Sequence, residues 1–134
     1  MASLIEIVSA TPALQHFVVD HQIVPGALFG ARGFYSFLAN LTPRFALDLW
    51  RACERGDWTE AARRRMLIEA FFRDWLAIPG MVTASPALAK IAVRAGISPD
   101  MPLRVRAPYR TGTQDQVDFL RRLLHERYPE LALT

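Results

Sequence analysis

Two short apolar runs near the start of the chain indicate its topology: QHFVVD at residues 15–20 and GFYSFLA at residues 33–39. Both are rich in β-branched or aromatic residues, which are typical of strands. The first run does not alternate between apolar and polar residues, which suits a strand buried on both faces of a parallel sheet. Residues 23–30 between them predict a short helix that ends at Gly30. Strand, helix and strand in so few residues predict a βαβ unit with parallel strands and a right-handed crossover.

From residue 42 onward the sequence predicts helices. Pro43 follows Thr42 where the first of them would start, and Asp57 with Glu60 resembles a capping box. Thr113 and Gln116 form a similar pair. The predicted helices cover residues 42–56, 57–79, 85–96 and 113–129, and a proline-rich loop covers residues 97–110. The apolar face predicted for the second helix consists of Met66, Leu67, Ala70, Phe71, Trp75 and Ile78.

Length and composition limit the class of protein. The chain has 134 residues, enough for one domain, and its 51% hydrophobic and 22% charged content is that of a globular protein rather than a disordered one. No apolar run approaches the roughly 18 residues that span a bilayer. One cysteine, Cys53, excludes an intramolecular disulfide framework. The first residues carry an early acid and no basic segment, so we expect a cytoplasmic protein without a membrane partner.

The basic charge does not by itself predict a nucleic-acid partner. The net charge is +3, but acidic and basic residues are interleaved along the chain. The densest run, residues 63–65, is three arginines flanked by Glu60 and Glu69, which is typical of the solvated face of a helix. We therefore expect no nucleic-acid partner.

Few residues suggest chemistry. His21 follows Asp20, but neighbours on a strand point to opposite faces, so we expect no catalytic or metal pair there unless the strand ends at this point. Cys53 lies in an apolar helical stripe and is expected to be a small buried group. Lys90, the only lysine, is expected to be a surface cation on a helix. Tyr35 and Ser36 lie inside an apolar strand, where each needs a partner, so they indicate either a pocket or a structural hydrogen bond. We expect no metal and no cofactor.

Four segments, taken in order, resemble one enzyme family. Residues 30–40, GARGFYSFLAN, continuing to Pro43, resemble the last barrel strand of the dihydrodipicolinate synthase / N-acetylneuraminate lyase family, where the pattern is roughly G-A-x-G-V-I-S-x-x-A-N-x-x-P. Residues 49–57 resemble the family's helix that ends in a Gly-Asp turn. SPALAK at residues 85–90 resembles its N-P-x-P-x-K segment with two departures, and LRVRAPY at residues 103–109 resembles its R-x-P-L tail.

The resemblance implies a fold and an activity. Members are class I aldolase-type lyases, built as (β/α)₈ barrels with a C-terminal helical region. A lysine on the sixth strand forms a Schiff base with pyruvate or another 2-oxo acid, and a tyrosine on an earlier strand shuttles protons. Such a barrel needs about 250 residues. The expected fold is therefore α/β: a partial TIM barrel holding the last two parallel strands within residues 1–41, then the last barrel helix and a helical tail in residues 42–134.

The same resemblance leaves the catalytic site incomplete. Neither the Schiff-base lysine nor the catalytic tyrosine has a counterpart here, because Lys90 matches a tail position. Tyr35 matches an eighth-strand position that lines the 2-oxo acid pocket, where isoleucine or valine is commoner, so Tyr35 is the one expected substrate-binding residue. We therefore expect that the gene is truncated, or that Met1 is an internal methionine of a longer protein.

Two functions remain as hypotheses. The first is the C-terminal portion of a Schiff-base lyase, an aldolase or dehydratase acting on 2-oxo acids such as pyruvate adducts or sugar acids, and inactive alone. The alternative is a stand-alone helical interaction module that binds a partner subunit. Either way we expect a homo-oligomer or association with the remaining barrel. The sequence leaves the substrate and the reaction within the family open.

Overall fold

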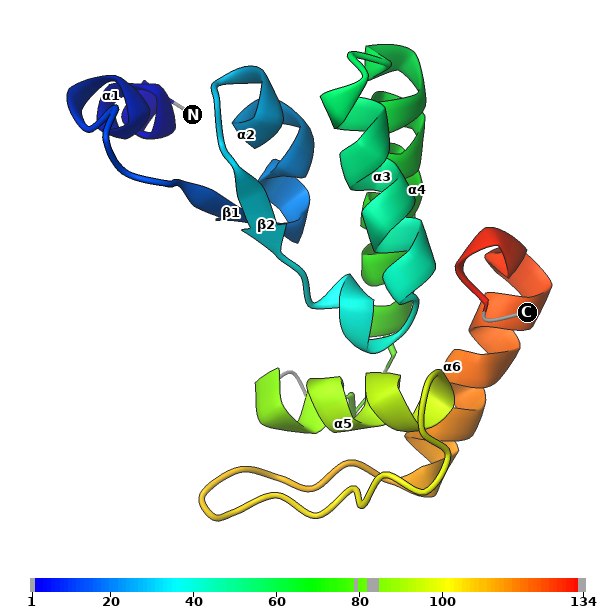
Figure 1. Ribbon diagram of the computed structural model, residues 1–134. Helices are drawn as coiled ribbons and strands as arrows, with labels where there is room; N and C mark the ends of the chain where they lie inside the picture. Colours follow the sequence, from blue (N-terminus) through cyan, green and yellow to red (C-terminus); the bar gives the residue numbers. More distant parts are fainter. Residues whose placement is uncertain (1, 79, 82–84, 133–134) are drawn as a thin grey trace.

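The computed structural model describes residues 2–78, 80–81 and 85–132 as helices joined to one small sheet (Figure 1). The strands are β1 (Phe17–Val19) and β2 (Gly33–Tyr35). The α-helices are α1 (Ala2–Ala10), α2 (Ile23–Leu28), α3 (Pro43–Glu54), α4 (Trp58–Leu76), α5 (Ser85–Ala95) and α6 (Gln114–Arg127). Three short 3₁₀ turns are η1 (Asp20–Gln22), η2 (Leu38–Asn40) and η3 (Pro129–Leu131).

The two strands form the predicted parallel βαβ unit. Phe17 lies opposite Gly33 and Val19 lies opposite Tyr35, with α2 as the connection. Both strands are shorter than the predicted runs at residues 15–20 and 33–39. The backbone turns into η1 at Asp20, and the second run leaves the sheet after Tyr35 and coils into η2. The apolar residues that extended the second prediction, from Phe37 onward, pack against helices instead.

The described helices cover only one face of this sheet. Val18 is buried on that face against α2, where a Cβ added to Gly26 would lie 2.7 Å from a Val18 methyl. On the same face, the Phe34 ring packs on Trp50 of α3 at 5.6 Å between centroids. The opposite face is open: Phe17 is 66% and Tyr35 78% exposed. The cover on both faces that suits this run in a complete parallel sheet is therefore missing on one face within the described residues, where Phe17 and Val19 are exposed.

The helical region has an aromatic centre. Helices α3 and α4 lie side by side, and α5 runs across their end near η2 before the chain returns through α6 (Figure 1). Phe71 contacts Trp75 and, edge-on, Tyr128, while Phe37 reaches the same cluster from the loop after β2. Because the buried residues of α2 and η2 belong to this core, the sheet and the helices are packed as one body. The domain boundary after residue 41 stays a prediction.

The helix ends follow the local signals with two partial exceptions, at Asp57 and at Thr42: Pro43 starts α3 as predicted, but the Thr42 side chain makes no capping hydrogen bond. Thr113 and Gln116 form the predicted capping box at the start of α6. Asp57 accepts the Glu60 N–H, but the Glu60 carboxylate binds two arginines instead of completing the box. Gly56 takes a positive φ of 71° just after α3, as its predicted stopping role requires. Pro79, the predicted end of the second helix, lies outside the described residues. None of the helices in the described part of the chain has the length and hydropathy needed to cross a bilayer.

Candidate functional site

The candidate site lies at the carboxyl ends of β1 and β2. Because the strands are parallel, both ends reach the same edge of the sheet. Asp20 follows β1 directly, and Ser36 and Phe37 follow β2. In parallel α/β proteins, ligands bind at this edge, where loops can bring side chains from different strands together.

Asp20 joins the two strand ends. Its Oδ1 accepts the Ser36 hydroxyl at 2.5 Å, and its Oδ2 accepts the backbone N–H of Phe37 at 2.6 Å and of Leu38 at 3.3 Å. Ser36 Oγ in turn accepts the Ala39 N–H at 3.1 Å. The carboxylate is buried, and these charge-assisted bonds compensate its desolvation. Of the two interpretations of Ser36, the structural hydrogen bond is confirmed.

Asp20 and His21 have different surroundings. Asp20 is 9% exposed and its two oxygens already accept three hydrogen bonds, whereas His21 is exposed. Strand β1 ends at Val19, so the argument that neighbours on a strand point to opposite faces does not apply to these two residues, and their lack of a joint role stays a prediction. Both nevertheless border the same pocket, because η1 turns the chain immediately after β1.

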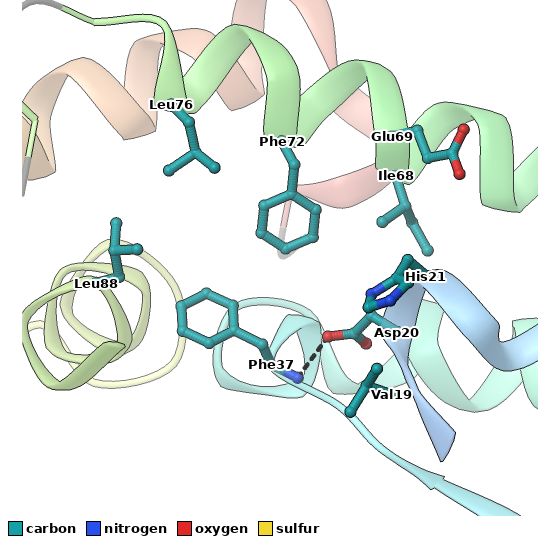
Figure 2. Close-up of a pocket in the computed structure, with 9 residues that line it drawn as sticks. All are labelled: Val19, Asp20, His21, Phe37, Ile68, Glu69, Phe72, Leu76 and Leu88. Atoms are coloured by element: carbon teal, nitrogen blue, oxygen red, sulfur yellow. Dashed lines mark hydrogen bonds between the residues drawn. The ribbon is translucent and has the colours of Figure 1, made fainter. Parts of the chain in front are cut away.

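That pocket lies between the strand ends and the helices α4 and α5, with a volume of about 560 Å³. Figure 2 shows the Phe37 and Phe72 side chains approaching each other beside it, with Leu76 and Leu88 toward one end and His21 and Glu69 toward the other. Its lining residues are Val19, Asp20, His21, Phe37, Ile68, Glu69, Phe72, Leu76 and Leu88. Most of the wall is apolar, so the pocket suits an apolar group with polar atoms only at one end.

The sequence did not predict this pocket, although one signal was present. Ile68, Phe72 and Leu76 recur at intervals of four on α4 and form an apolar stripe beside the predicted one. The predicted face included Met66, which is 64% exposed, so that assignment is wrong. Phe71 and Trp75 of the predicted face are fully buried, as expected.

Tyr35 lies outside the pocket lining but next to it. Its side chain is on the open face of the sheet together with Phe17 and Val19. Val19, the partner of Tyr35 in the strand register, also lines the pocket. The open face and the pocket therefore adjoin at Val19. The substrate-binding role of Tyr35 stays a prediction.

Two other residues singled out in the sequence have structural roles. Cys53 is buried in α3, and burial raises the pKa of its thiol, so it is the small buried group that was expected. Lys90 is half-buried on α5, and its Nζ donates to the Arg104 carbonyl at 2.5 Å. Lys90 thus fastens α5 to the proline-rich loop, a contact that the expectation of a surface cation missed.

The arginine run is held in ion pairs. Arg63 contacts both Glu60 and Glu130, and Arg64 contacts Glu60. The hydrogen bond from Arg63 is the main cause that lowers the pKa of Glu60 to about 2. Arg65 pairs with Glu69 at 2.5 Å. The run lies on α4 as predicted; Arg63 connects α4 to η3, and Glu69, the partner of Arg65, borders the pocket. Within residues 2–78, 80–81 and 85–132, no cluster of three or more metal-ligating side chains occurs.

Comparisons with known proteins give a likeness in structure. No protein-family model matches the chain, and no curated protein matches its sequence. The N-acetylneuraminate lyase of Fusobacterium nucleatum superposes with a TM-score of 0.71 at 16% identity, over 98% of this chain and 42% of that one. A catalytic lysine mutant of the Ruminococcus gnavus sialic acid aldolase superposes with a TM-score of 0.76 at 16% identity, over 97% of this chain and 43% of that one.

These likenesses confirm, at the level of the fold, the resemblance to the dihydrodipicolinate synthase / N-acetylneuraminate lyase family. The strand pair and the helical region together match part of an aldolase of that type. The chain spans less than half the length of each solved structure that it matches. An extent of this size agrees with the expectation of a C-terminal portion.

Proposed function

We propose that this chain supplies the last two strands and the C-terminal helical region of a Schiff-base-forming lyase that acts on 2-oxo acids. The observation that carries the proposal is the open sheet face, with Phe17 and Tyr35 exposed, in a chain that has the fold of part of an aldolase. Parallel sheets occur almost only with both faces covered. A barrel provides that cover, because its interior is filled by side chains from all of its strands.

The arrangement of the helices supports the same proposal. In a (β/α)₈ barrel the helices form the outer ring and the opposite strand faces point inward. Here Val18 and Phe34 face α2 and α3, so Phe17, Val19 and Tyr35 would point into a completed barrel. Active sites of such barrels lie at the carboxyl ends of the strands. Tyr35, the last residue of β2, is therefore positioned to form part of the wall of a 2-oxo acid pocket.

The chain is proposed to be inactive alone. A Schiff base forms when an unprotonated lysine amine attacks the substrate carbonyl, which requires a lysine in a desolvated pocket. Lys90, the only lysine in the chain, is outside the pocket lining, and its amine is bound to the Arg104 carbonyl. The nucleophile and the proton-shuttling tyrosine would come from the first six strands, and the part played by this chain is to close the barrel and line the pocket.

Complementation tests this function. The chain would be co-expressed with the first six strands of full-length relatives, including the Fusobacterium nucleatum lyase, and treated with pyruvate and borohydride. We expect a heteromer by size-exclusion chromatography with light scattering, and a pyruvate adduct on the lysine of the six-strand fragment by mass spectrometry. The chain alone should give no adduct. An adduct on Lys90 would contradict the proposal.

The open face also supports the alternative, a stand-alone module that binds a partner subunit. Apolar residues such as Phe17 and Tyr35 on an unpaired sheet edge favour association whatever the partner. Failure to associate with the six-strand fragments of several relatives would favour this alternative. Both hypotheses include self-association of the chain. The cytoplasmic location stays a prediction.

A further inference from the structure

The pocket beside the strand ends adjoins the position proposed for the substrate. Val19 and Tyr35 are opposite each other in the parallel register, so their side chains share the open face. Val19 is 42% exposed on that face and is also part of the pocket wall. A molecule that lies against Tyr35 at one end can therefore extend past Val19 into the pocket.

The walls of the pocket select for an apolar group. Phe37, Ile68, Phe72, Leu76 and Leu88 offer no hydrogen-bonding side chain. The two oxygens of Asp20 are occupied by Ser36 and by the backbone of η2. A hydroxyl group placed deep in this pocket would lose its water without a compensating hydrogen bond. A polyhydroxylated substrate tail is thus disfavoured in the apolar part of the pocket, away from the end where His21 and Glu69 lie.

The shape and the aromatic residues favour a ring. The pocket volume of about 560 Å³ is within the range of roughly 300–1,000 Å³ that is usual for small-molecule sites. The Phe37 and Phe72 rings are 6.0 Å apart between centroids and inclined at 57°, and Trp75 already packs against both. A ligand ring would therefore pack against the sides of these rings that line the pocket.

One of the polar side chains at the end of the pocket, that of Glu69, is already in an ion pair. Glu69 is bound to Arg65, and Arg65 Nε also donates to the His21 carbonyl at 3.2 Å. These residues close the end of the pocket beyond Ile68 without adding an unpaired charge to its interior. The polar end therefore does not call for a charged ligand.

We propose that this pocket binds an uncharged aryl or branched alkyl tail of a 2-oxo acid substrate, whose oxo-acid end lies toward Tyr35. The 2-oxo acid part rests on the proposed function, whereas the preference for an apolar tail rests on the pocket alone. The substrate class inferred here is thus an apolar 2-oxo acid rather than a sugar acid.

Binding to the full 134-residue chain tests the pocket directly. The probes are 3-phenylpropanol, which has the ring but no oxo acid, 4-phenyl-2-oxobutanoate, which has both, and N-acetylneuraminate, a polyhydroxylated acid. We expect both phenyl compounds to bind by titration calorimetry and to shift the NMR resonances of Phe37, Ile68 and Leu88. We expect N-acetylneuraminate to bind at least about tenfold more weakly than either, because its hydroxyls would be buried unpaired.

Two matched variants on α4 give the control. Leu76→Asp introduces a charge into the pocket wall and should weaken binding of both phenyl compounds about tenfold or more. Met66→Asp places the same charge on an exposed position of α4 away from the pocket and should change binding by less than about twofold. Equal effects of the two variants, or preferred binding of N-acetylneuraminate, would overturn the proposal.

The orientation of the ligand separates this proposal from the proposed function. In bound 4-phenyl-2-oxobutanoate we expect nuclear Overhauser effects from the ring to the methyl groups of Ile68 and Leu88, and from the methylene next to the carbonyl to the Val19 methyls. The reverse orientation would overturn the assignment of a 2-oxo acid, while binding of 3-phenylpropanol would still support an apolar pocket. Absence of near-ultraviolet circular dichroism from the Phe37–Phe72–Trp75 cluster would overturn both, because the pocket requires these rings to be packed. None of these readouts depends on complementation.

Discussion

The carboxylate of Asp20 accepts the backbone N–H of Phe37, with 2.6 Å between Oδ2 and N, and so ties the end of one parallel strand to the end of the next. The contact spans 17 residues and crosses the α2 connection. It sets the path of the chain as it leaves β2. Tyr35, before this point, is exposed on the open side of the sheet. Phe37, after it, lines the pocket (Figure 2).

Replacing Asp20 with asparagine should destabilise the fold. The amide carries no charge and has one acceptor oxygen: this oxygen can keep the backbone N–H groups while the NH₂ donates to Ser36 Oγ, but the bonds are then no longer charge-assisted. We expect the free energy of unfolding to fall by about 2 kcal/mol, because charge-assisted bonds in a buried site are lost. Urea unfolding followed by circular dichroism measures this change. Asp100→Asn, in the loop after α5, is the control, and an equal effect of both changes would contradict the role assigned to Asp20.

The Tyr128–Asp74 hydrogen bond should make stability dependent on pH. Tyr128 Oη donates to Asp74 Oδ2 at 2.5 Å, which is the main cause that lowers the pKa of Asp74 below its ordinary 3.8. A lowered carboxyl pKa in the folded state stabilises the fold above the unfolded pKa, and that stability is lost as the pH falls through the folded value. The pKa of Tyr128 is raised above its ordinary 10.0, first by burial and then by this bond. The part due to the bond stabilises the fold below the unfolded pKa of the tyrosine and is lost as the pH rises through the folded value.

Tyr128→Phe tests this dependence. We expect the difference in unfolding free energy between the natural chain and the variant to be constant from roughly pH 5 to pH 9. It should shrink as the pH falls below 3.8, and again as it rises above 10.0. Urea titrations across this range give the profile. Tyr109→Phe, on an exposed loop tyrosine, should show no such profile. A flat difference from pH 2 to pH 7 would show that the Asp74 contact does not act as described.

Two glycines should differ sharply in their tolerance of alanine. A Cβ on Gly96 would lie 2.5 Å from the Leu41 carbonyl oxygen, so backbone must move, and we expect a loss of about 1–3 kcal/mol. A Cβ on Gly33 would lie 2.6 Å from the Phe17 ring, but that ring is 66% exposed and can rotate away. The melting temperature of the Gly96→Ala variant should therefore be well below that of the Gly33→Ala variant. The opposite ranking would mean that the Phe17 ring is fixed.

The open sheet face should drive self-association of the isolated chain. Phe17→Asp places a charge on that face at the start of β1 and should weaken association about tenfold or more in sedimentation equilibrium. Leu47→Asp, on an exposed position of α3, is the matched control and should have little effect. If the natural chain is already a monomer that unfolds in one sharp transition, this expectation is wrong.

Tyr35→Ala should affect the substrate more than assembly in the complemented enzyme. The side chain is on the open face, which would form part of the wall of the 2-oxo acid pocket in the complete barrel. We expect a higher KM for the 2-oxo acid, with heteromer formation unchanged in size-exclusion chromatography. Tyr109→Ala provides the control for general loss of an aromatic residue. If Tyr35→Ala prevented assembly but left KM unchanged, the residue would belong to the interface and not to the substrate site.

Much of the local structure could be predicted because its causes are short-range. The Thr113–Gln116 capping box involves neighbouring turns of one helix, and the positive φ of Gly56 follows from glycine's lack of a Cβ. The parallel strand pair follows from two apolar runs joined by a helix. By contrast, the predicted strands were too long. The residues after each strand form the turns η1 and η2 instead of extending the sheet, and hydrogen bonds to Asp20, which exist only in the folded chain, hold them there.

The sequence by itself determined the order of elements, their capping and the resemblance to one lyase family, since each depends on residues close together in the chain. Only the tertiary structure decided which side of the sheet the helices cover, where Asp20 finds its partners, and that α4 and α5 enclose a pocket with the strand ends. Periodicity places Ile68, Phe72 and Leu76 on one stripe of a helix, but what that stripe faces depends on how distant segments pack. Packing of this kind is set by the fit of many side chains at once, and for that reason the pocket became visible only in the folded chain.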